Sequence, residues 1–154
     1  MNQINLMISK FMNIELKNIS EIKDNLEKLS ILFHDAGVKE YLCETHRFSF
    51  VVYRPVYELA KKSKKYGFIP IWIVPIVETK IDLFPIALIN KLEKDSKNKD
   101  WLLDLELVQD KLFVKGVANK YSIDLSSDSK LNIYDIGQPD WNNHVSSFSK
   151  PKLF

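Results

Sequence analysis

The segment that most constrains the fold is the apolar run from Tyr66 to Val77, the longest in the chain. Its branched and aromatic side chains suit a buried strand. The run is too short to cross a membrane as a helix, so we expect it to belong to the core. Pro75 has no amide hydrogen, which predicts that the strand lies at an edge, carries a bulge or ends near Val74.

The size and charge of the chain narrow the class of protein. Its 154 residues suit a single domain over residues 1–154, and the apolar fraction of 45% is enough for a core. A net charge of +2 with only two arginines, Arg47 and Arg54, makes nucleic acid an unlikely partner. The single cysteine, Cys43, fits a reducing compartment. The first residues lack the pattern of a secretory signal, so we expect a cytoplasmic protein without a membrane partner.

Helical periodicity is clearest over residues 20–36. Ser20 is the predicted N-cap, and Gly37 is the predicted end of this helix. Four apolar residues recur at helical spacing and are expected to face the core: Ile22, Leu26, Leu29 and Phe33.

Three further segments predict short helices. Prolines open the segments 55–66 and 85–94, where proline is tolerated at the first helical position, and a last short helix or loop is expected over 139–149. A basic cluster near the end of the first of these is either a solvated face or a patch for an anionic contact: Lys61, Lys62, Lys64 and Lys65.

A period of two replaces the helical period from Trp101 onward. The alternation places Leu103 and Leu105 on one face together with Trp101, and we expect this face to be buried. Short turns between successive strands predict an antiparallel meander over about residues 101–136. Helices followed by strands predict an α+β fold, in which the N-terminal helix and the short helices pack on a mainly antiparallel sheet.

Metal-ligating and nucleophilic residues are few. Cys43 and His46 lie three residues apart, but no second pair matches them, and neither His34 nor His144 has a partner at helical zinc spacing. A structural role for these residues is favoured over a metal site or a Cys43–His46 nucleophilic pair. We therefore expect no cofactor and no tight metal site.

Asp104 and Glu106 lie two residues apart on one strand face, with Lys111 and Lys115 following. This set resembles the composition of a metal-dependent nuclease centre, and the interpretation stays open as an alternative. The favoured interpretation is the polar face of an antiparallel sheet. The same two carboxylates also form an alternative surface for a partner.

Two of the three tryptophans, Trp72 and Trp101, lie within apolar patterns and are expected in the core. Trp141 lies in the polar segment 138–144, where it either caps the sheet edge or anchors a partner, since tryptophan is enriched at the energetic centres of interfaces.

Acidic residues surround Trp141 in the sequence. Asp135 and Asp140 precede it, His144 follows it, and residues 131–149 contain no lysine. An inhibitor of a basic enzyme needs carboxylates around an apolar anchor. We therefore predict that Asp135, Asp140, Trp141 and His144 form the partner-binding site.

The C-terminal third resembles the SUKH superfamily of single-domain α+β proteins. Over about residues 116–150 it has a strand ending in an Asp-Leu pair, a second strand, a glycine, an acidic–aromatic pair and a Ser-Phe pair. The residues are Tyr121 to Leu125, Leu131 to Asp135, Gly137, Asp140-Trp141 and Ser147-Phe148. The resemblance implies a non-catalytic binding module, because many bacterial members look like immunity proteins that neutralise a toxin domain.

Three hypotheses for the function follow. The first is a non-catalytic interaction protein, most plausibly an immunity or antitoxin-type inhibitor that binds a toxin domain. The second is a small metal-dependent nuclease or hydrolase that uses Asp104 and Glu106. The third is a structural subunit of a larger assembly, for example one that is phage-borne.

Overall fold

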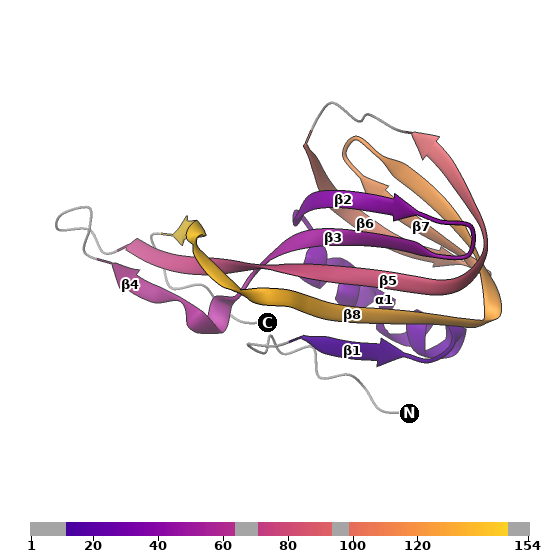
Figure 1. Ribbon diagram of the computed structural model, residues 1–154, viewed down its shortest axis with the longest axis horizontal. Helices are drawn as coiled ribbons and strands as arrows, with labels where there is room; N and C mark the ends of the chain where they lie inside the picture. Colours follow the sequence, from indigo (N-terminus) through magenta and orange to yellow (C-terminus); the bar gives the residue numbers. More distant parts are fainter. Residues whose placement is uncertain (1–11, 64–70, 94–98, 148–154) are drawn as a thin grey trace.

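Strands dominate the structure (Figure 1). The computed structural model describes residues 12–63, 71–93 and 99–147. Within these ranges there is one α-helix, α1 (Ile19–Phe33), and one 3-10 turn, η1 (Tyr57–Leu59). The strands are β1 (Asn13–Leu16), β2 (Gly37–Cys43), β3 (Phe48–Pro55), β4 (Lys61–Ser63), β5 (Ile71–Glu93), β6 (Asp100–Val108), β7 (Lys111–Gly116) and β8 (Lys120–Ser147).

All the strands belong to one antiparallel sheet with the order β1-β8-β7-β6-β2-β3-β5-β4, in which β5 also pairs with β8. Because β2 pairs with β6 and β5 pairs with β8, six strands form a closed ring of pairings: β2, β3, β5, β8, β7 and β6. The seam between β2 and β6 consists of only two residue pairs, Gly37 with Trp101 and Val38 with Asp100.

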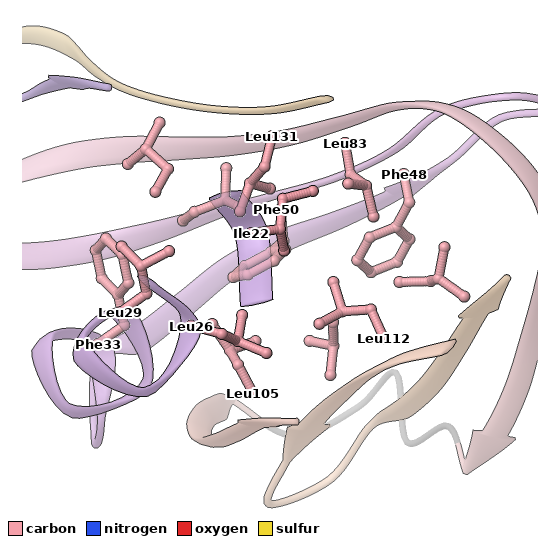
Figure 2. Packing of buried hydrophobic residues seen from close by; sticks show 14 of the residues in the cluster. Ile22, Leu26, Leu29, Phe33, Phe48, Phe50, Leu83, Leu105, Leu112 and Leu131 are labelled. Atoms are coloured by element: carbon pink, nitrogen blue, oxygen red, sulfur yellow. The ribbon is translucent and has the colours of Figure 1, made fainter. Parts of the chain in front are cut away.

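Helix α1 packs against the inner face of this sheet. Ile22, Leu26, Leu29 and Phe33 are all buried, as their spacing predicts, and Figure 2 shows them meeting strand residues such as Leu105 and Leu131. The N-cap is Asn18 rather than Ser20, because the Asn18 side chain accepts the amide of Glu21 at 2.9 Å. The helix is therefore confirmed, but it starts two residues earlier than predicted and ends at Phe33, before the predicted end at Gly37, which instead begins β2.

The two long strands, β5 and β8, pair with each other from Trp72 with Ser147 to Glu93 with Lys120. At one end they extend beyond the ring, where β4 joins the first residues of β5 (Figure 1, left). We call this extension the arm: β4, residues 71–77 of β5 and residues 140–147 of β8. Three alternatives were predicted for Pro75, and β5 does not end near Val74. The pairing of β5 with β8 is irregular between Pro75 and Ile76, but the extra residues of this irregularity lie in β8.

The predicted α+β class is wrong, because the described residues form a nearly all-sheet structure. The three short helices are absent from the described residues: segment 55–66 contains η1 and β4, segment 85–94 continues β5, and segment 139–149 continues β8 to Ser147. Short apolar runs do not distinguish helix from strand by period alone. Here the decision comes from pairing between β5 and β8, which lie far apart in sequence.

The expected burial of Leu103 is also wrong. The register of β6 against β7 shifts between Leu102 and Asp104, which is a β-bulge. The bulge turns Leu103 outward, so that it is 39% exposed, while Leu102 and Leu105 are buried. Trp101 also faces outward, at 45% exposed, instead of entering the core.

Candidate partner-binding surfaces

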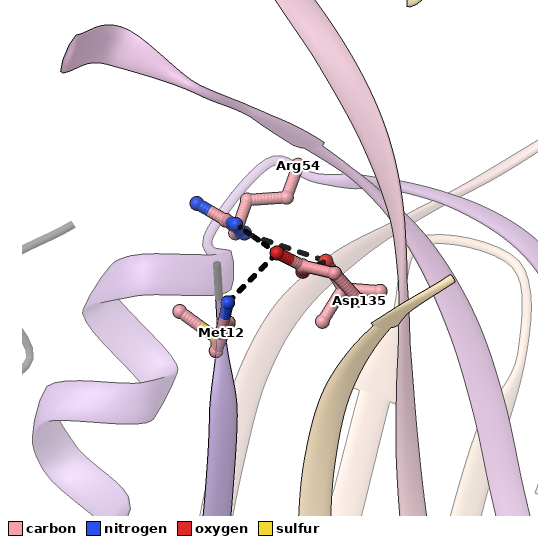
Figure 3. A network of polar contacts seen from close by, with 4 residues as sticks. Met12, Arg54 and Asp135 are labelled. Carbon is pink, nitrogen blue, oxygen red and sulfur yellow. Dashed lines mark hydrogen bonds and ion pairs between the residues drawn. The ribbon is translucent and has the colours of Figure 1, made fainter. Parts of the chain in front are cut away.

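Asp135 belongs to a buried ion pair at the base of the arm (Figure 3). Its carboxylate lies 2.7 Å from Arg54 Nη2 and accepts hydrogen bonds from the Thr79 hydroxyl and the Met12 amide, both at 2.8 Å. The side chains of Arg54 and Asp135 are each 1% exposed. This carboxylate is therefore inaccessible to a partner, and it ties β1, β3, β5 and β8 together.

Asp140 and Trp141 lie where β8 bulges. Pro75 pairs with His144 while Ile76 pairs with Asp140, so residues 141–143 have no counterpart on β5. The Asp140 carboxylate accepts the amide of Asn142 at 2.9 Å, which stabilises the bulge. His144 contributes backbone pairing, and its side chain lies outside the described part of the structure.

Trp141 contacts the basic segment that the sequence places far from it. The ammonium group of Lys61, on β4, lies 4.4 Å from the centre of the Trp141 ring. Such a cation–π contact orders both side chains and covers one part of the ring. Trp141 is half-buried, so the arm presents a tryptophan next to positive charge rather than within a purely acidic rim.

The alternative carboxylates, Asp104 and Glu106, do lie on one face of β6, but each already has a partner. Asp104 accepts the Ser30 hydroxyl of α1 at 2.7 Å, and Glu106 pairs with Lys115 of β7 at 2.7 Å. The described residues contain no group of three carboxylate, histidine or cysteine side chains that would hold a metal ion.

Cys43 and His46 lie at the turn between β2 and β3. Cys43 is exposed. The ring of His46 lies 3.3 Å from the carbonyl oxygen of Ile86, and its own carbonyl accepts the Ile86 amide at 2.9 Å. These contacts attach the turn to β5, which is a structural role.

A second buried carboxylate, Asp100, lies at the seam between β2 and β6. It accepts the Tyr41 hydroxyl at 2.6 Å and the Asn119 side chain at 3.0 Å. The amides of Trp101 and Ala118 donate at 2.9 and 2.8 Å. Burial alone would raise the pKa of Asp100, but these four donors outweigh it and hold the pKa below its ordinary value.

A third carboxylate, Asp82, is 6% exposed and lies 3.6 Å from Arg47 Nε. Burial raises the pKa of Asp82, and the charge of Arg47 opposes that effect. The Arg47 guanidinium also lies 4.3 Å from the centre of the Phe84 ring, so it is held across this part of the sheet. Arg47 therefore partly compensates the buried charge.

The most exposed aromatic residues of the sheet lie in one transverse row. Each residue of this row pairs with the next one on the neighbouring strand. In order across the sheet, the residues are Ile136 of β8, Glu78 of β5, Tyr53 of β3, Gly37 of β2 and Trp101 of β6. We call these five residues the exposed row. Since paired residues share a face, all of them lie on the side opposite the core.

The exposed row is apolar except at one position. Ile136, Tyr53 and Trp101 are 41%, 38% and 45% exposed. Glu78 is neutralised by Lys39 at 2.8 Å, a contact that also raises the pKa of this lysine. At the Trp101 end the row continues into exposed Val117, whose amide donates to the Trp101 carbonyl at 3.0 Å.

Gly37 lies between the two aromatic residues of the row. A methyl group at Gly37 would lie 3.4 Å from Tyr53 Cδ2, so the tyrosine ring lies over the glycine. Sequence analysis missed this surface, because its members come from five strands and no local pattern contains them. The glycine in front of an alternating segment was the one available signal.

Comparisons with known proteins add no identity: no family model, no curated protein and no solved structure matches the chain. Over the described residues, no helix is both long enough and apolar enough to span a membrane.

Proposed function

We propose that this chain is a non-catalytic binding protein of the cytoplasm, most plausibly an immunity or antitoxin-type inhibitor that holds a toxin domain. The observation that carries the proposal is the exposed row, in which Tyr53, Trp101 and Ile136 are exposed on one face of the sheet. Gly37 lies between Tyr53 and Trp101 in this row, and Glu78 lies between Tyr53 and Ile136. Exposed apolar side chains that gather on one face mark interaction sites, whereas single exposed ones do not.

The composition of the exposed row suits a protein partner. Tyrosine and tryptophan supply large contact areas at a low cost in side-chain entropy and dominate the energetics of interfaces. Their backbones are fixed by strand pairing, so little ordering remains to be done when a partner binds. The pair between Lys39 and Glu78 leaves the Glu78 position of the row without net charge, which favours an apolar partner surface there.

The carboxylates argue against a hydrolytic centre. Asp100 and Asp135 are saturated by donors inside the protein. Asp104 and Glu106 are bonded to Ser30 and Lys115. A metal-dependent nuclease needs carboxylate oxygens that are free to bind the ion.

The inhibitor type within this proposal rests on the sequence resemblance to the SUKH superfamily alone. The α+β fold and the two separate strands that this resemblance implies are not found, since residues 121–125 and 131–135 both belong to β8. The arm supplies a second candidate contact through Asp140, Trp141 and His144, with Lys61 against the tryptophan ring. A toxin domain that contacts this end would meet both signs of charge, since Lys61 contacts the ring of Trp141, the residue that follows Asp140.

The test begins with affinity capture from the native cell, followed by calorimetry with the purified partner. We expect Trp101→Ser to weaken binding by about 2 kcal/mol or more, because a large exposed tryptophan of the interface is lost. Val108→Ser is the matched control, because Val108 is 47% exposed on the same strand but lies outside the exposed row. This variant should bind the partner with an affinity near that of the wild type.

The outcomes separate the surfaces. Wild-type affinity in Trp101→Ser and in Tyr53→Ser, with a loss in Trp141→Ala, would place the interface on the arm and contradict the use of the exposed row. Wild-type affinity in all three variants would contradict both surfaces. A captured partner whose activity is unchanged by the bound chain would contradict the inhibitor type.

A further inference from the structure

Three polar side chains cross the middle of the sheet in a second transverse row. Asp82 of β5 pairs with Ser49 of β3 on one side and with Asn132 of β8 on the other. We call these three residues the polar row. Each of them lies four residues from the member of the exposed row on its own strand, and the pairing between the two rows is regular. The polar row therefore lies on the same face as the exposed row, opposite the core.

The polar row is buried although it faces away from the core. Ser49 is 2% and Asp82 is 6% exposed. In the part of the chain that the structure describes, Asp82 Oδ1 and Asn132 Oδ1 are buried and have no hydrogen-bond partner. A buried acceptor without a donor costs free energy, and here two such acceptors belong to directly paired residues. This pair of oxygen atoms lacks one donor.

The nearest cation does not supply that donor. Arg47 Nε lies 3.6 Å from Asp82 Oδ1, beyond hydrogen-bond distance, and the Arg47 guanidinium is held over the Phe84 ring. Burial raises the pKa of Asp82, Arg47 and Lys80 lower it, and Glu44 raises it.

Charged side chains face the polar row from every neighbouring segment. They are Glu40 of β2, Glu44 and Arg47 beside the turn between β2 and β3, Lys80 of β5, Lys130 of β8 and Glu15 of β1. A metal ion or an ammonium group at Asp82 would be repelled by Arg47 and Lys80. A proton is the donor that fits, because it removes the charge of Asp82 instead of adding a second cation beside Arg47.

From this geometry we infer that Asp82 and Asn132 form a proton-operated bond between β5 and β8. On acidification, Asp82 takes a proton from solvent on Oδ1 and donates it in a hydrogen bond to Asn132 Oδ1. A protonated carboxyl group has one hydrogen to donate and an amide oxygen accepts it, so one proton satisfies both atoms. The same step ends the ion pair with Arg47, which keeps its positive charge on the face of the exposed row. The inference does not depend on what the exposed row binds.

Protonation of Asp82 favours the folded state. Because its pKa in the folded protein lies above the ordinary value of 3.8, the folded chain binds this proton more tightly than the unfolded chain. The contribution of Asp82 to stability therefore rises as the pH falls through the folded pKa, and it is complete below 3.8.

The first test is an NMR titration of the full-length chain labelled with ¹³C at the aspartate carboxyl groups. The Asp82 signal is assigned by its absence in Asp82→Asn. We expect its titration midpoint above 3.8 in wild type, and higher still in Arg47→Gln, where the opposing charge is gone. A wild-type midpoint at or below 3.8 overturns the inference.

The second test replaces the acid proton with a permanent donor. Asp82→Asn can present an amide nitrogen to Asn132 Oδ1, so we expect a higher midpoint of urea unfolding than in wild type at neutral pH. The two midpoints should converge as the pH falls toward 3.8, where wild type has gained its proton. Asp110→Asn is the control at an exposed carboxyl group and should unfold near the wild-type midpoint at neutral pH.

A lower midpoint in Asp82→Asn at neutral pH overturns the inference. It would mean that an ionised Asp82 already accepts a hydrogen bond, either from the nitrogen of a turned Asn132 amide or from a bridging water.

The third test asks whether the gain comes from Asn132. In an Asn132→Leu background, Asp82→Asn should raise the urea midpoint much less, because its amide nitrogen then has no acceptor. An equal gain in both backgrounds would assign the effect to the removal of a buried charge alone and overturn the bond to Asn132. Asn132→Ala serves as the background if the leucine variant does not fold.

Discussion

Asp135 and Asp100 are both buried carboxylates at places where strands from distant parts of the sequence join, but they are stabilised differently. Asp135 has a full positive charge beside it, Arg54 at 2.7 Å, together with two neutral donors. Asp100 has four hydrogen bonds, from Tyr41, Asn119 and the amides of Trp101 and Ala118. None of these four donors carries a formal charge.

The difference predicts how each site fails. An ion pair depends on two groups, and removal of either one leaves a buried charge without compensation. A carboxylate that accepts four hydrogen bonds from neutral donors keeps most of its stabilisation when one donor is removed, since each donor contributes separately. The base of the arm should therefore be sensitive to single substitutions, whereas the seam between β2 and β6 should weaken by degrees.

The largest expected effect is at the ion pair. Asp135→Ala leaves Arg54 buried without its counter-charge, and we expect the free energy of unfolding to fall by about 3–5 kcal/mol. Urea denaturation followed by circular dichroism measures this loss.

The double variant Arg54→Met, Asp135→Leu is the matched control for that measurement. It removes both charges and should recover most of the lost stability, because apolar replacements of a buried pair are often neutral. A double variant no more stable than Asp135→Ala would show that shape, rather than charge compensation, governs this site.

A smaller effect is expected from crowding the seam. A methyl group at Gly116 would collide with the Asp100 carboxylate and lie 2.7 Å from the Tyr41 hydroxyl oxygen. Gly116→Ala should therefore cost about 1–3 kcal/mol, the usual range for overpacking. Thermal unfolding measures it, and Gly137→Ala is unsuitable as a control because Gly137 has a positive φ of 76°.

Ala118→Ser offers a better comparison for Gly116→Ala, because the Ala118 amide that binds Asp100 is retained and only the side chain changes. Stability near wild type in Gly116→Ala would mean that Asp100 and Tyr41 shift aside without losing their contacts, and the close approach would then have no energetic importance.

The two sites also show what the sequence can and cannot reveal. Helix α1 was predictable because its signals are local: Ile22, Leu26, Leu29 and Phe33 follow the helical period. The members of the Asp100 and Asp135 sites come from separate strands, and only the pairing of these strands brings them together. No spacing in the sequence indicates that Arg54 lies against Asp135.

The errors in the sheet have the same origin. Residues 85–93 belong to β5 because residues 120–125 of β8 pair with this part of the strand. The alternation of β6 was read correctly as a strand, but a bulge between Leu102 and Asp104 reversed which residues face outward. That reversal exposed Leu103 and Trp101, so the exposed row could not be predicted from the sequence.

The smallest expected effect is the loss of one dipole from Asp100. Tyr41→Phe removes the hydroxyl that donates at 2.6 Å, and three donors to Asp100 remain, so we expect a cost of about 0.5–1.5 kcal/mol near neutral pH. Burial, the hydrogen bond and the charge of Asp100 all raise the pKa of Tyr41, so the hydroxyl stays protonated and remains a donor. Tyr53→Phe is the control, because Tyr53 is 38% exposed and removal of its hydroxyl should leave the free energy of unfolding nearly unchanged.

The pH dependence of that cost distinguishes a hydrogen bond to an ionised carboxylate from simple packing. The pKa of Asp100 in the folded protein lies below the ordinary value of 3.8, so its ionised form is favoured by folding. The stabilisation is complete above pH 3.8 and is lost as the pH falls through the lower, folded pKa. Because Tyr41→Phe brings the pKa of Asp100 back toward 3.8, the variant has less of this stabilisation to lose.

The difference in the free energy of unfolding between wild type and Tyr41→Phe should therefore narrow in acid, as measured by urea unfolding at a series of pH values. A difference that stays constant would assign the cost to packing of the ring, and the contrast between Asp100 and Asp135 would then lose its electrostatic basis.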